Sequence, residues 1–233
     1  MIIAAFVADY FKASYIQRSW HDWVDVNSKT KNSEVAVLIE PMGALGESLC
    51  HALFRRGAKL VLVSDRPNSG IFSERLAVEG IEASWRFVST DLDGSMDGLF
   101  SDLSQVYGQV NSLTSFFPAN ITGPAANFLG QSATSISKLI EPQFRSRLKL
   151  MQTLMPLVTR TGIAINLHVG LRGRPDYQRG LRGHVAHLID DLLSTELTER
   201  DIACTHIATA QGSLMEVQRD LEHILAVLGK PTN

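Results

Sequence analysis

Two histidines and two aspartates at helical spacing form a metal-ligand pattern in this sequence. His184 and His187 are three residues apart on a predicted helix, and Asp190 and Asp191 follow one turn later. Metal sites use such spacing, because side chains three or four residues apart lie on one face of a helix. Exposed helical faces and oligomer contacts produce the same pattern. We therefore expect no metal ion at this helix.

A group of four arginines precedes this helix: Arg172, Arg174, Arg179 and Arg182. Guanidinium groups bind oxyanions through paired hydrogen bonds, so the group could hold a phosphate, a coenzyme A tail or an acidic partner surface. The alternative is a solvated loop whose charge is balanced by Asp176 and the two later aspartates. We favour the solvated loop, because no glycine-rich cradle or aromatic platform accompanies the arginines.

The candidate nucleophiles lie in no motif that would activate them. Ser48, Ser194 and Ser213 lack the sequence of a nucleophile elbow, which argues against a hydrolase. Cys50 and Cys204 lie far apart on apolar segments, as expected for buried, reduced thiols. Because two cysteines cannot form a disulfide scaffold, we expect a cytoplasmic protein.

Charge and hydropathy argue against several classes of partner. The formal net charge of −2 gives no electrostatic reason to expect binding to nucleic acid or to an anionic membrane. No segment approaches the roughly 20 uninterrupted apolar residues that a membrane-spanning helix needs. The apolar start Ile2–Val7 is too short and wrongly flanked for a signal peptide. We expect neither a nucleic-acid partner nor a membrane span.

Strand and helix patterns alternate from Glu34 onward, in a chain of 233 residues with 45% hydrophobic side chains. Apolar segments predict strands at Glu34–Ile39, Lys59–Ser64, Ala83–Ser89, Ser112–Phe117, Ile163–Val169 and Ala203–Ala208. Helical patterns lie at Leu45–Arg56, Ile71–Glu79, Met96–Tyr107, Ser137–Leu157, Gly183–Leu197 and Leu214–Leu228. This order predicts an α/β fold with a doubly wound parallel sheet, whose ligands bind beyond the carboxyl ends of the strands.

The first 33 residues lie outside this alternation. Aromatic and aliphatic residues recur there at helical spacing, at Ile3, Phe6, Val7, Tyr10 and Phe11. We therefore expect an N-terminal amphipathic helix and linker over residues 1–33, and one Rossmann-like domain over residues 34–233. The helix is expected to pack on its own domain, with docking on a partner subunit as the main alternative.

The series of landmarks from Glu34 to Gly212 resembles the short-chain dehydrogenase/reductase family. The segment Val35–Gly46 and its continuation Arg56–Arg66 are similar to the family's first strand, turn and second strand. Further landmarks follow at matching intervals, at Asp91-Leu92, Tyr107–Asn111, Met155-Pro156 and Leu193–Leu197. The resemblance implies a Rossmann-like sheet of about six strands in the order 3-2-1-4-5-6.

The glycine-rich turn of this family is only partly retained. Family members use glycines there so that bare backbone can approach the cofactor pyrophosphate at the start of the first helix. In this sequence the first glycine position falls on Glu40 and the middle one on Ala44, which leaves Gly46, with Gly43 nearby. A carboxylate beside a phosphate would weaken binding, so we expect no bound cofactor.

Two acidic residues match positions that contact the cofactor's nucleoside in the family. The resemblance places Asp65 at a ribose hydroxyl and Asp91 near the adenine. Both could instead face solvent or cap the following helix. With Gly43 and Gly46 they form at best a vestigial site, and NAD(P) binding stays open as an alternative.

The catalytic positions implied by the resemblance have lost the required residue types. The family uses a Tyr as proton donor or acceptor, a Lys that lowers its pKa, a Ser that orients the substrate and a relay Asn. The Asn, Tyr and Lys positions fall on Gln143, Arg179 and Gly183, and His168-Val169 stands where serines are expected. No tyrosine of the chain is followed four residues later by lysine. We therefore expect no catalytic residues for hydride transfer.

Two further departures from the family affect the expected substrate site. Ser115–Pro118 replaces the usual Asn-Asn-Ala-Gly, and its phenylalanine rings would intrude where a nicotinamide should lie. Gly212-Ser213 passes almost directly into the last helix, so we expect the substrate-covering loop and the seventh strand to be missing.

The expected association surface consists of the helices 137–157 and 183–197. In the family the corresponding helices pair across a two-fold axis, and both carry apolar stripes here. The leading hypothesis is a catalytically inactive, structural or regulatory subunit that pairs with an active relative or with itself. One alternative is an NAD(P)-dependent oxidoreductase of altered mechanism, with His168, Tyr177 or Arg179 as proton donor. Another is a sensor that binds a nucleotide or acyl-CoA.

Overall fold

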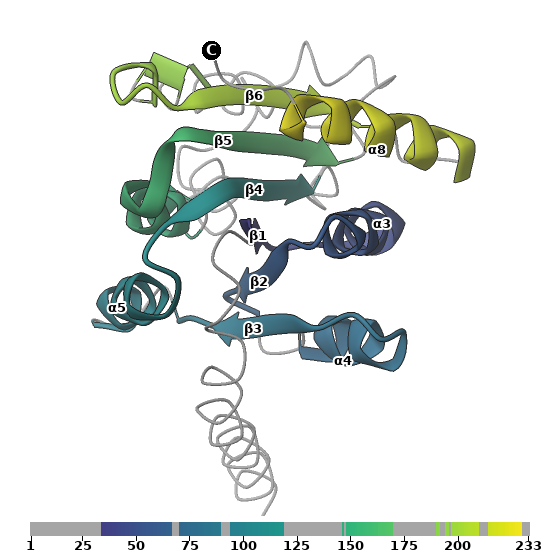
Figure 1. Ribbon diagram of the computed structural model, residues 1–233, viewed down its shortest axis with the longest axis horizontal. Helices are drawn as coiled ribbons and strands as arrows, with labels where there is room; N and C mark the ends of the chain where they lie inside the picture. The colour runs from purple at the N-terminus through teal and green to yellow at the C-terminus, as the bar shows by residue number, and fades with distance from the viewer. Residues whose placement is uncertain are drawn as a thin grey trace, which may run out of the picture. The chain divides into compact units, whose positions relative to one another are not determined.

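Six parallel strands form one sheet in the computed structural model, which describes residues 34–66, 70–89, 94–118, 146, 148–169, 190–191, 194–195, 197–209 and 214–229 (Figure 1). The strands are β1 (Val35–Ile39), β2 (Lys59–Ser64), β3 (Ala83–Phe87), β4 (Val110–Pro118), β5 (Val158–Val169) and β6 (Ala203–Ala208). Their order is β3-β2-β1-β4-β5-β6. This order confirms the predicted doubly wound, Rossmann-like sheet.

Burial explains why the central strands lack polar alternation. All five residues of β1 are buried, as are the five residues Leu60–Ser64 of β2. Strands covered by helices on both faces read as continuous apolar segments. The edge strands β3 and β6 are mostly half-buried and carry more polar side chains.

Helices cover both faces of the sheet. The helices α3 (Gly43–Arg55), α4 (Gly70–Val78) and α8 (Leu214–Leu228) lie on one side in Figure 1, and α5 (Ser95–Tyr107) lies on the other. These four helices lie within two residues of the predicted bounds at each end. Residues 146, 148–154, 190–191, 194–195 and 197–198 are also helical, within the two long helices that the sequence predicts. The predicted N-terminal helix over residues 1–33 lies outside the described residues.

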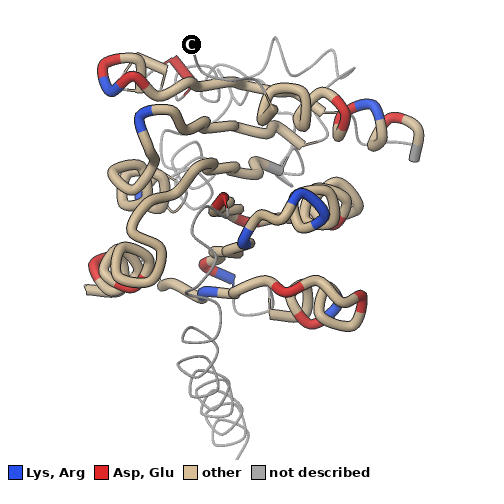
Figure 2. The backbone as a smooth tube through the Cα atoms, in the orientation of Figure 1, with Lys and Arg blue, Asp and Glu red and all other residues tan. Residues whose placement is uncertain are grey.

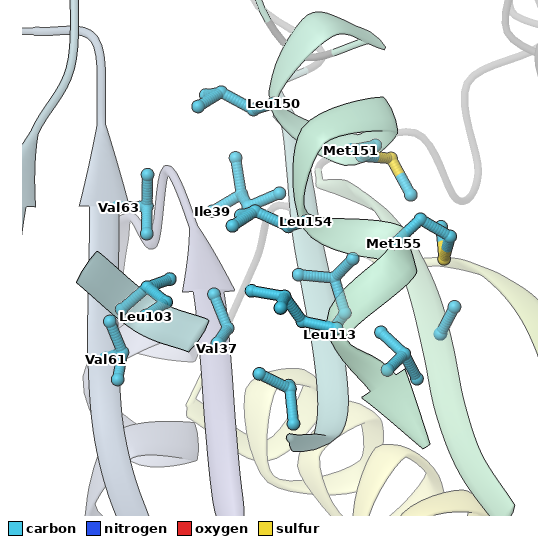
Figure 3. Packing of buried hydrophobic residues seen from close by; sticks show 14 of the residues in the cluster. Val37, Ile39, Val61, Val63, Leu103, Leu113, Leu150, Met151, Leu154 and Met155 are labelled. Atoms are coloured by element: carbon cyan, nitrogen blue, oxygen red, sulfur yellow. The ribbon is translucent and has the colours of Figure 1, made fainter. Parts of the chain in front are cut away.

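Each face of the sheet has its own apolar core. One core joins the strands to α3, α4 and α8. The other packs α5 and residues 148–157 against the opposite face, as Figure 3 shows around Ile39, Leu113 and Leu154. Burial of these apolar side chains is the main favourable contribution that holds the helices to the sheet.

The strand β5 begins five residues earlier than predicted. Val158 pairs with Val110, but the regular ladder between β4 and β5 resumes only at Ser112 and Ile163. One residue of β4, Asn111, therefore lies opposite residues 159–162 of β5. Residues 159–162 of this irregular segment are polar residues and a glycine, so the apolar pattern predicted that the strand starts at Ile163. The predicted helix also ends earlier, because Met155–Leu157 forms a 3₁₀ turn that contains Pro156.

Replacing Gly162 by Ala is expected to destabilise the protein by about 1–3 kcal/mol. An added Cβ would lie 2.8 Å from the Thr159 carbonyl oxygen and 3.0 Å from that of Asn111, so backbone must move. Gly98→Ala in α5 is the matched control, since its Cβ would meet nothing within 4 Å and alanine favours helix by about 0.5–1 kcal/mol. Urea unfolding measures both variants, and equal stability of G162A and wild type would contradict the expectation.

Basic and acidic residues are interspersed along the helices and at strand ends (Figure 2). The strands themselves are largely free of charge in the same view. Within the described parts of the chain, no helix combines the length and apolar character needed to cross a membrane.

Candidate functional site

A buried glutamate links the carboxyl ends of β1 and β2. Glu40 follows β1 directly and has a φ of 54°, in the left-handed region that glycine adopts without steric cost. Its side chain is 5% exposed. One carboxylate oxygen accepts hydrogen bonds from the Ser64 hydroxyl at 2.7 Å and from the Asp65 N–H at 2.8 Å. The other oxygen lies 3.3 Å from Arg66 Nε.

These contacts define what the carboxyl group does. Burial raises the pKa of Glu40, the hydrogen bond from Ser64 opposes this rise, and the neighbouring Asp65 adds to it. The family resemblance places this carboxylate at the position of the cofactor pyrophosphate. The structure directs it to the end of β2 instead, where it satisfies polar groups that a ligand could otherwise bind.

The glycines of the turn have structural roles in this chain. Gly43 begins α3 with a φ of 61°. A Cβ on Gly46 would lie 3.2 Å from the backbone carbon of Pro41 and 3.4 Å from the Phe72 ring. The retained Gly46 therefore allows α3 to approach the preceding turn closely.

The predicted nucleoside contacts have different outcomes. Asp65 accepts a hydrogen bond from the Ser146 hydroxyl, which links the end of β2 to the helix that contains Ser146. Asp91 lies outside the described residues. Neither observation tests a role in binding a nucleotide.

A second polar cluster lies between β5, β6 and a helical segment. This segment contains Asp190, Ser194 and Leu197 and is called here the Asp190 segment. Asn166 and His168 alternate along β5, as Cys204 and His206 do along β6, so all four point to one face of the sheet. Asn166 pairs in register with His206. Parallel strands thus bring together residues about forty positions apart in sequence.

The Asp190 carboxylate is the centre of this cluster and is 5% exposed. His168 Nε2 lies 2.8 Å from one carboxylate oxygen, and His206 Nδ1 lies 2.8 Å from the other. Asn166 Nδ2 lies 3.3 Å from the second oxygen. The ring of His168 stacks on Phe117 at 5.4 Å between centroids. The carboxylate is therefore shared by two imidazoles and an amide.

The outer nitrogen of His206 faces two further side chains. The Ser194 hydroxyl lies 2.7 Å from His206 Nε2, and Cys204 Sγ lies 3.5 Å from it. Cys204 is half-buried rather than buried, unlike the expectation, whereas burial raises the pKa of Cys50 to about 12. The cluster can therefore exchange protons or bind a cation, whereas the Cys50 thiol stays protonated at neutral pH.

Burial and pairing act in opposite directions on the ionisable groups. Burial disfavours the His206 imidazolium, but the hydrogen bonds to Asp190 and Cys204 and their charges outweigh it and raise the pKa of His206 to about 9. Burial also favours neutral Asp190, but hydrogen bonds from His168 and His206 and their charges lower the pKa of Asp190. The pair is ionised at neutral pH.

Wild-type stability is expected to fall by about 2–3 kcal/mol more than that of His206→Gln as the pH rises from 6.5 to 9. Because the pKa of His206 is higher in the folded state, its contribution to stability is complete below the pKa of the unfolded state. This contribution is lost as the pH rises through about 9. The lowered pKa of Asp190 acts only in acid, so it does not contribute in this window. Urea unfolding in EDTA-containing buffer measures the difference, and parallel pH profiles would contradict it.

The structure shows neighbours of Asp190 that the sequence pattern did not predict. Local helical spacing paired it with His184 and His187, which lie outside the described residues. The structure instead pairs it with His168 and His206, which lie on strands. Polar residues at alternating positions near the carboxyl ends of two predicted strands were the signal that could have identified them.

Most catalytic positions carried over from the resemblance cannot be located. Gln143, Arg179 and Gly183 lie outside the described residues, as do Tyr177 and the arginine cluster. Val169 is the last residue of β5 and is half-buried against the core that includes α3 and α8. The site predictions therefore stay predictions.

Comparisons with known proteins identify the fold. The structure is similar to the crystal structure of a metagenomic short-chain oxidoreductase in complex with NADP, with a TM-score of 0.62, 16% identity and coverage of 86% of this chain and 92% of that one. It is also similar to the NADH-dependent enoyl-[acyl-carrier-protein] reductase from Aquifex aeolicus VF5, with a TM-score of 0.60, 14% identity and coverage of 82% and 79%. A short-chain dehydrogenase from Streptomyces avermitilis has a TM-score of 0.59, 12% identity and coverage of 86% and 85%. No family model and no curated protein matches the sequence. At these identities the likeness shows a shared fold.

Proposed function

We propose that this protein has the fold of a short-chain dehydrogenase but does not perform hydride transfer, and that it acts as a structural or regulatory subunit. It pairs with an active relative or with a second copy of itself. The observation that carries the proposal is the Glu40 carboxyl group, which bonds to Ser64 and Asp65 where related folds leave room for a dinucleotide.

The full sequence supports the same conclusion. Its four tyrosines are Tyr10, Tyr15, Tyr107 and Tyr177, and none is followed four residues later by lysine. In the family that lysine is the cation that lowers the phenol pKa toward neutrality. Tyr107, the one tyrosine within the described residues, has its pKa raised by burial.

The pairing role is supported by the resemblance more than by exposed surface. Met151, Leu154 and Met155 of the expected stripe on helix 137–157 pack in this chain's own core. The residues of the apolar stripe on helix 183–197 lie outside the described residues. A partner surface, if formed by these helices, must therefore use residues other than those three.

Two measurements test the proposal. Calorimetric titration with NAD(H), NADP(H) and coenzyme A is expected to show no binding at millimolar ligand. Co-purification from the native source, followed by light scattering, is expected to show a dimer or a mixed oligomer. A solitary monomer at physiological concentration, or tight dinucleotide binding with turnover, would overturn the proposal.

A second candidate is an oxidoreductase of altered mechanism with His168 as proton donor. The contact between His168 and Asp190 favours it, because a carboxylate fixes the orientation of an imidazole that transfers protons. Saturable NADPH binding that survives His168→Gln while NADPH oxidation is lost would support this candidate over the first.

A further inference from the structure

Three potential metal ligands converge in the Asp190 cluster. Within the described part of the chain, His168, Asp190 and His206 form a group whose ligand atoms all lie within 4.8 Å of one another. They come from β5, the Asp190 segment and β6, so no local repeat produces the arrangement. Two imidazole nitrogens and a carboxylate form a donor set that suits Zn²⁺ and neighbouring divalent transition metals.

The three ligand atoms lie close enough to converge on one ion when the side chains adjust. Each imidazole nitrogen lies 2.8 Å from a carboxylate oxygen. Ligands about 2.0–2.1 Å from a tetrahedral zinc ion are separated by roughly 3.3 Å. Binding of an ion therefore requires each imidazole–carboxylate pair to open by about half an ångström, and the three ligand atoms, which lie within 4.8 Å of one another, to converge on it.

The surrounding side chains match those that support metal ligands elsewhere. A histidine that binds metal through one nitrogen usually donates the other N–H to an acceptor, which fixes the tautomer. His206 presents Nδ1 to Asp190, and its Nε2 lies 2.7 Å from the Ser194 hydroxyl. Ser194 therefore orients His206 for binding through Nδ1.

Asn166 adds an independent observation. Its Nδ2 lies 3.2 Å from His206 Nδ1, yet its Oδ1 is buried without a hydrogen-bond partner, as is the Ser115 hydroxyl on the neighbouring strand. An amide is nearly symmetric in shape, so a half-turn places Oδ1 among the three ligand atoms. A carbonyl oxygen can then act as a fourth ligand. A cation at this position would give the unpartnered Asn166 oxygen a partner.

The same side chains also resemble the relay of a serine hydrolase, in the order Ser194, His206, Asp190. That reading leaves His168 and the Asn166 oxygen without a role. Ser194 also lies within a helical segment, and a helix uses most of its own backbone N–H groups, which leaves few for an oxyanion hole. The metal site gives a role to Asn166, His168, Asp190, Ser194 and His206.

We propose that His168, Asp190 and His206 bind one divalent transition-metal ion, with Zn²⁺ as the best match, and that the ion fixes the Asp190 segment to β5 and β6. Because the ligands are largely buried, the role of the ion is structural. The proposal does not depend on the proposed function, since it concerns stability and not nucleotide binding or pairing.

Titration of the full-length protein with ZnCl₂ after EDTA treatment tests the site. Calorimetry is expected to show one ion per chain, and the Tm is expected to rise by roughly 5–10 °C when zinc is about a hundredfold above Kd. His168→Gln and His206→Gln are each expected to weaken binding by at least about a hundredfold, and Ser194→Ala by about tenfold. Circular dichroism checks that each variant folds.

Matched controls separate this site from other histidines. His51→Gln, at the surface beside Glu79, and the double variant His184→Gln/His187→Gln are expected to bind zinc like wild type. Loss of binding in the double variant but not in His168→Gln would overturn the assignment, as would absence of saturable binding in wild type.

Two measurements on wild type remain decisive if a variant fails to fold. Cobalt substitution is expected to give visible bands without a thiolate charge-transfer band; such a band would make Cys204 a ligand and overturn the donor set. Labelling of Ser194 by a fluorophosphonate in zinc-treated protein would support the hydrolase relay and also overturn the proposal.

Discussion

Replacing Glu40 and Ala44 together by glycine is expected to raise the affinity for NADH by about ten- to a thousandfold. The double variant removes the carboxyl group that spans β1 and β2 and restores bare backbone at both altered positions of the turn. Glycine also adopts the φ of 54° at position 40 without steric cost. Calorimetric titration with NADH measures the gain.

The single variant Ala44→Gly is the matched control for this gain. It supplies backbone freedom but keeps the Glu40 side chain in place, so its NADH affinity is expected to stay that of wild type. Equal affinities of the single and double variants would show that Glu40 is not the obstacle. A folded double variant that does not bind NADH at millimolar concentration would lead to the same conclusion about Glu40.

Replacing Asp190 by Asn is expected to destabilise the protein by about 3–5 kcal/mol. The carboxylate accepts from two imidazoles on opposite oxygens, and an amide offers only one acceptor in its place. A buried histidine then lacks its partner, and the raised pKa of His206 loses its main attractive cause.

Asp191→Asn provides the comparison on the same helical segment. Asp191 is exposed, so its replacement is expected to change stability by no more than about 0.5 kcal/mol. Urea unfolding at pH 7 without added metal measures both variants. Similar losses for the two would mean that the cluster around Asp190 contributes little to folding.

The sheet could be predicted from sequence because its signal is local and repeated. Val35–Ile39 and Leu60–Val63 are continuous apolar segments bounded by polar residues, and the structure buries both on the two faces of the sheet. Helix ends followed by glycine, as at Gly57 and Gly108, could be predicted equally well. Six strands and their order follow from such signals together with the family resemblance.

The polar clusters could not be predicted in the same way, because their contacts join distant positions. The partners of Asp190 are 22 residues before it, at His168, and 16 residues after it, at His206. Periodicity along one helix contains no information about which strand residues that helix covers. Glu40 was recognised as unusual, but its hydrogen bonds to Ser64 and Asp65 depend on the register of β1 and β2.

The central position of β1 constrains the kinetics with which the chain assembles. Leu38 pairs with Leu62 on one side, 24 positions later, and with Thr114 on the other, 76 positions later. The shorter connection closes at lower entropic cost, so β1, β2 and β3 can associate while the open edge of β1 still lacks its neighbour. Until β4 pairs with β1, the apolar edge of β1 is available to other chains. Aggregation therefore competes with folding at this edge.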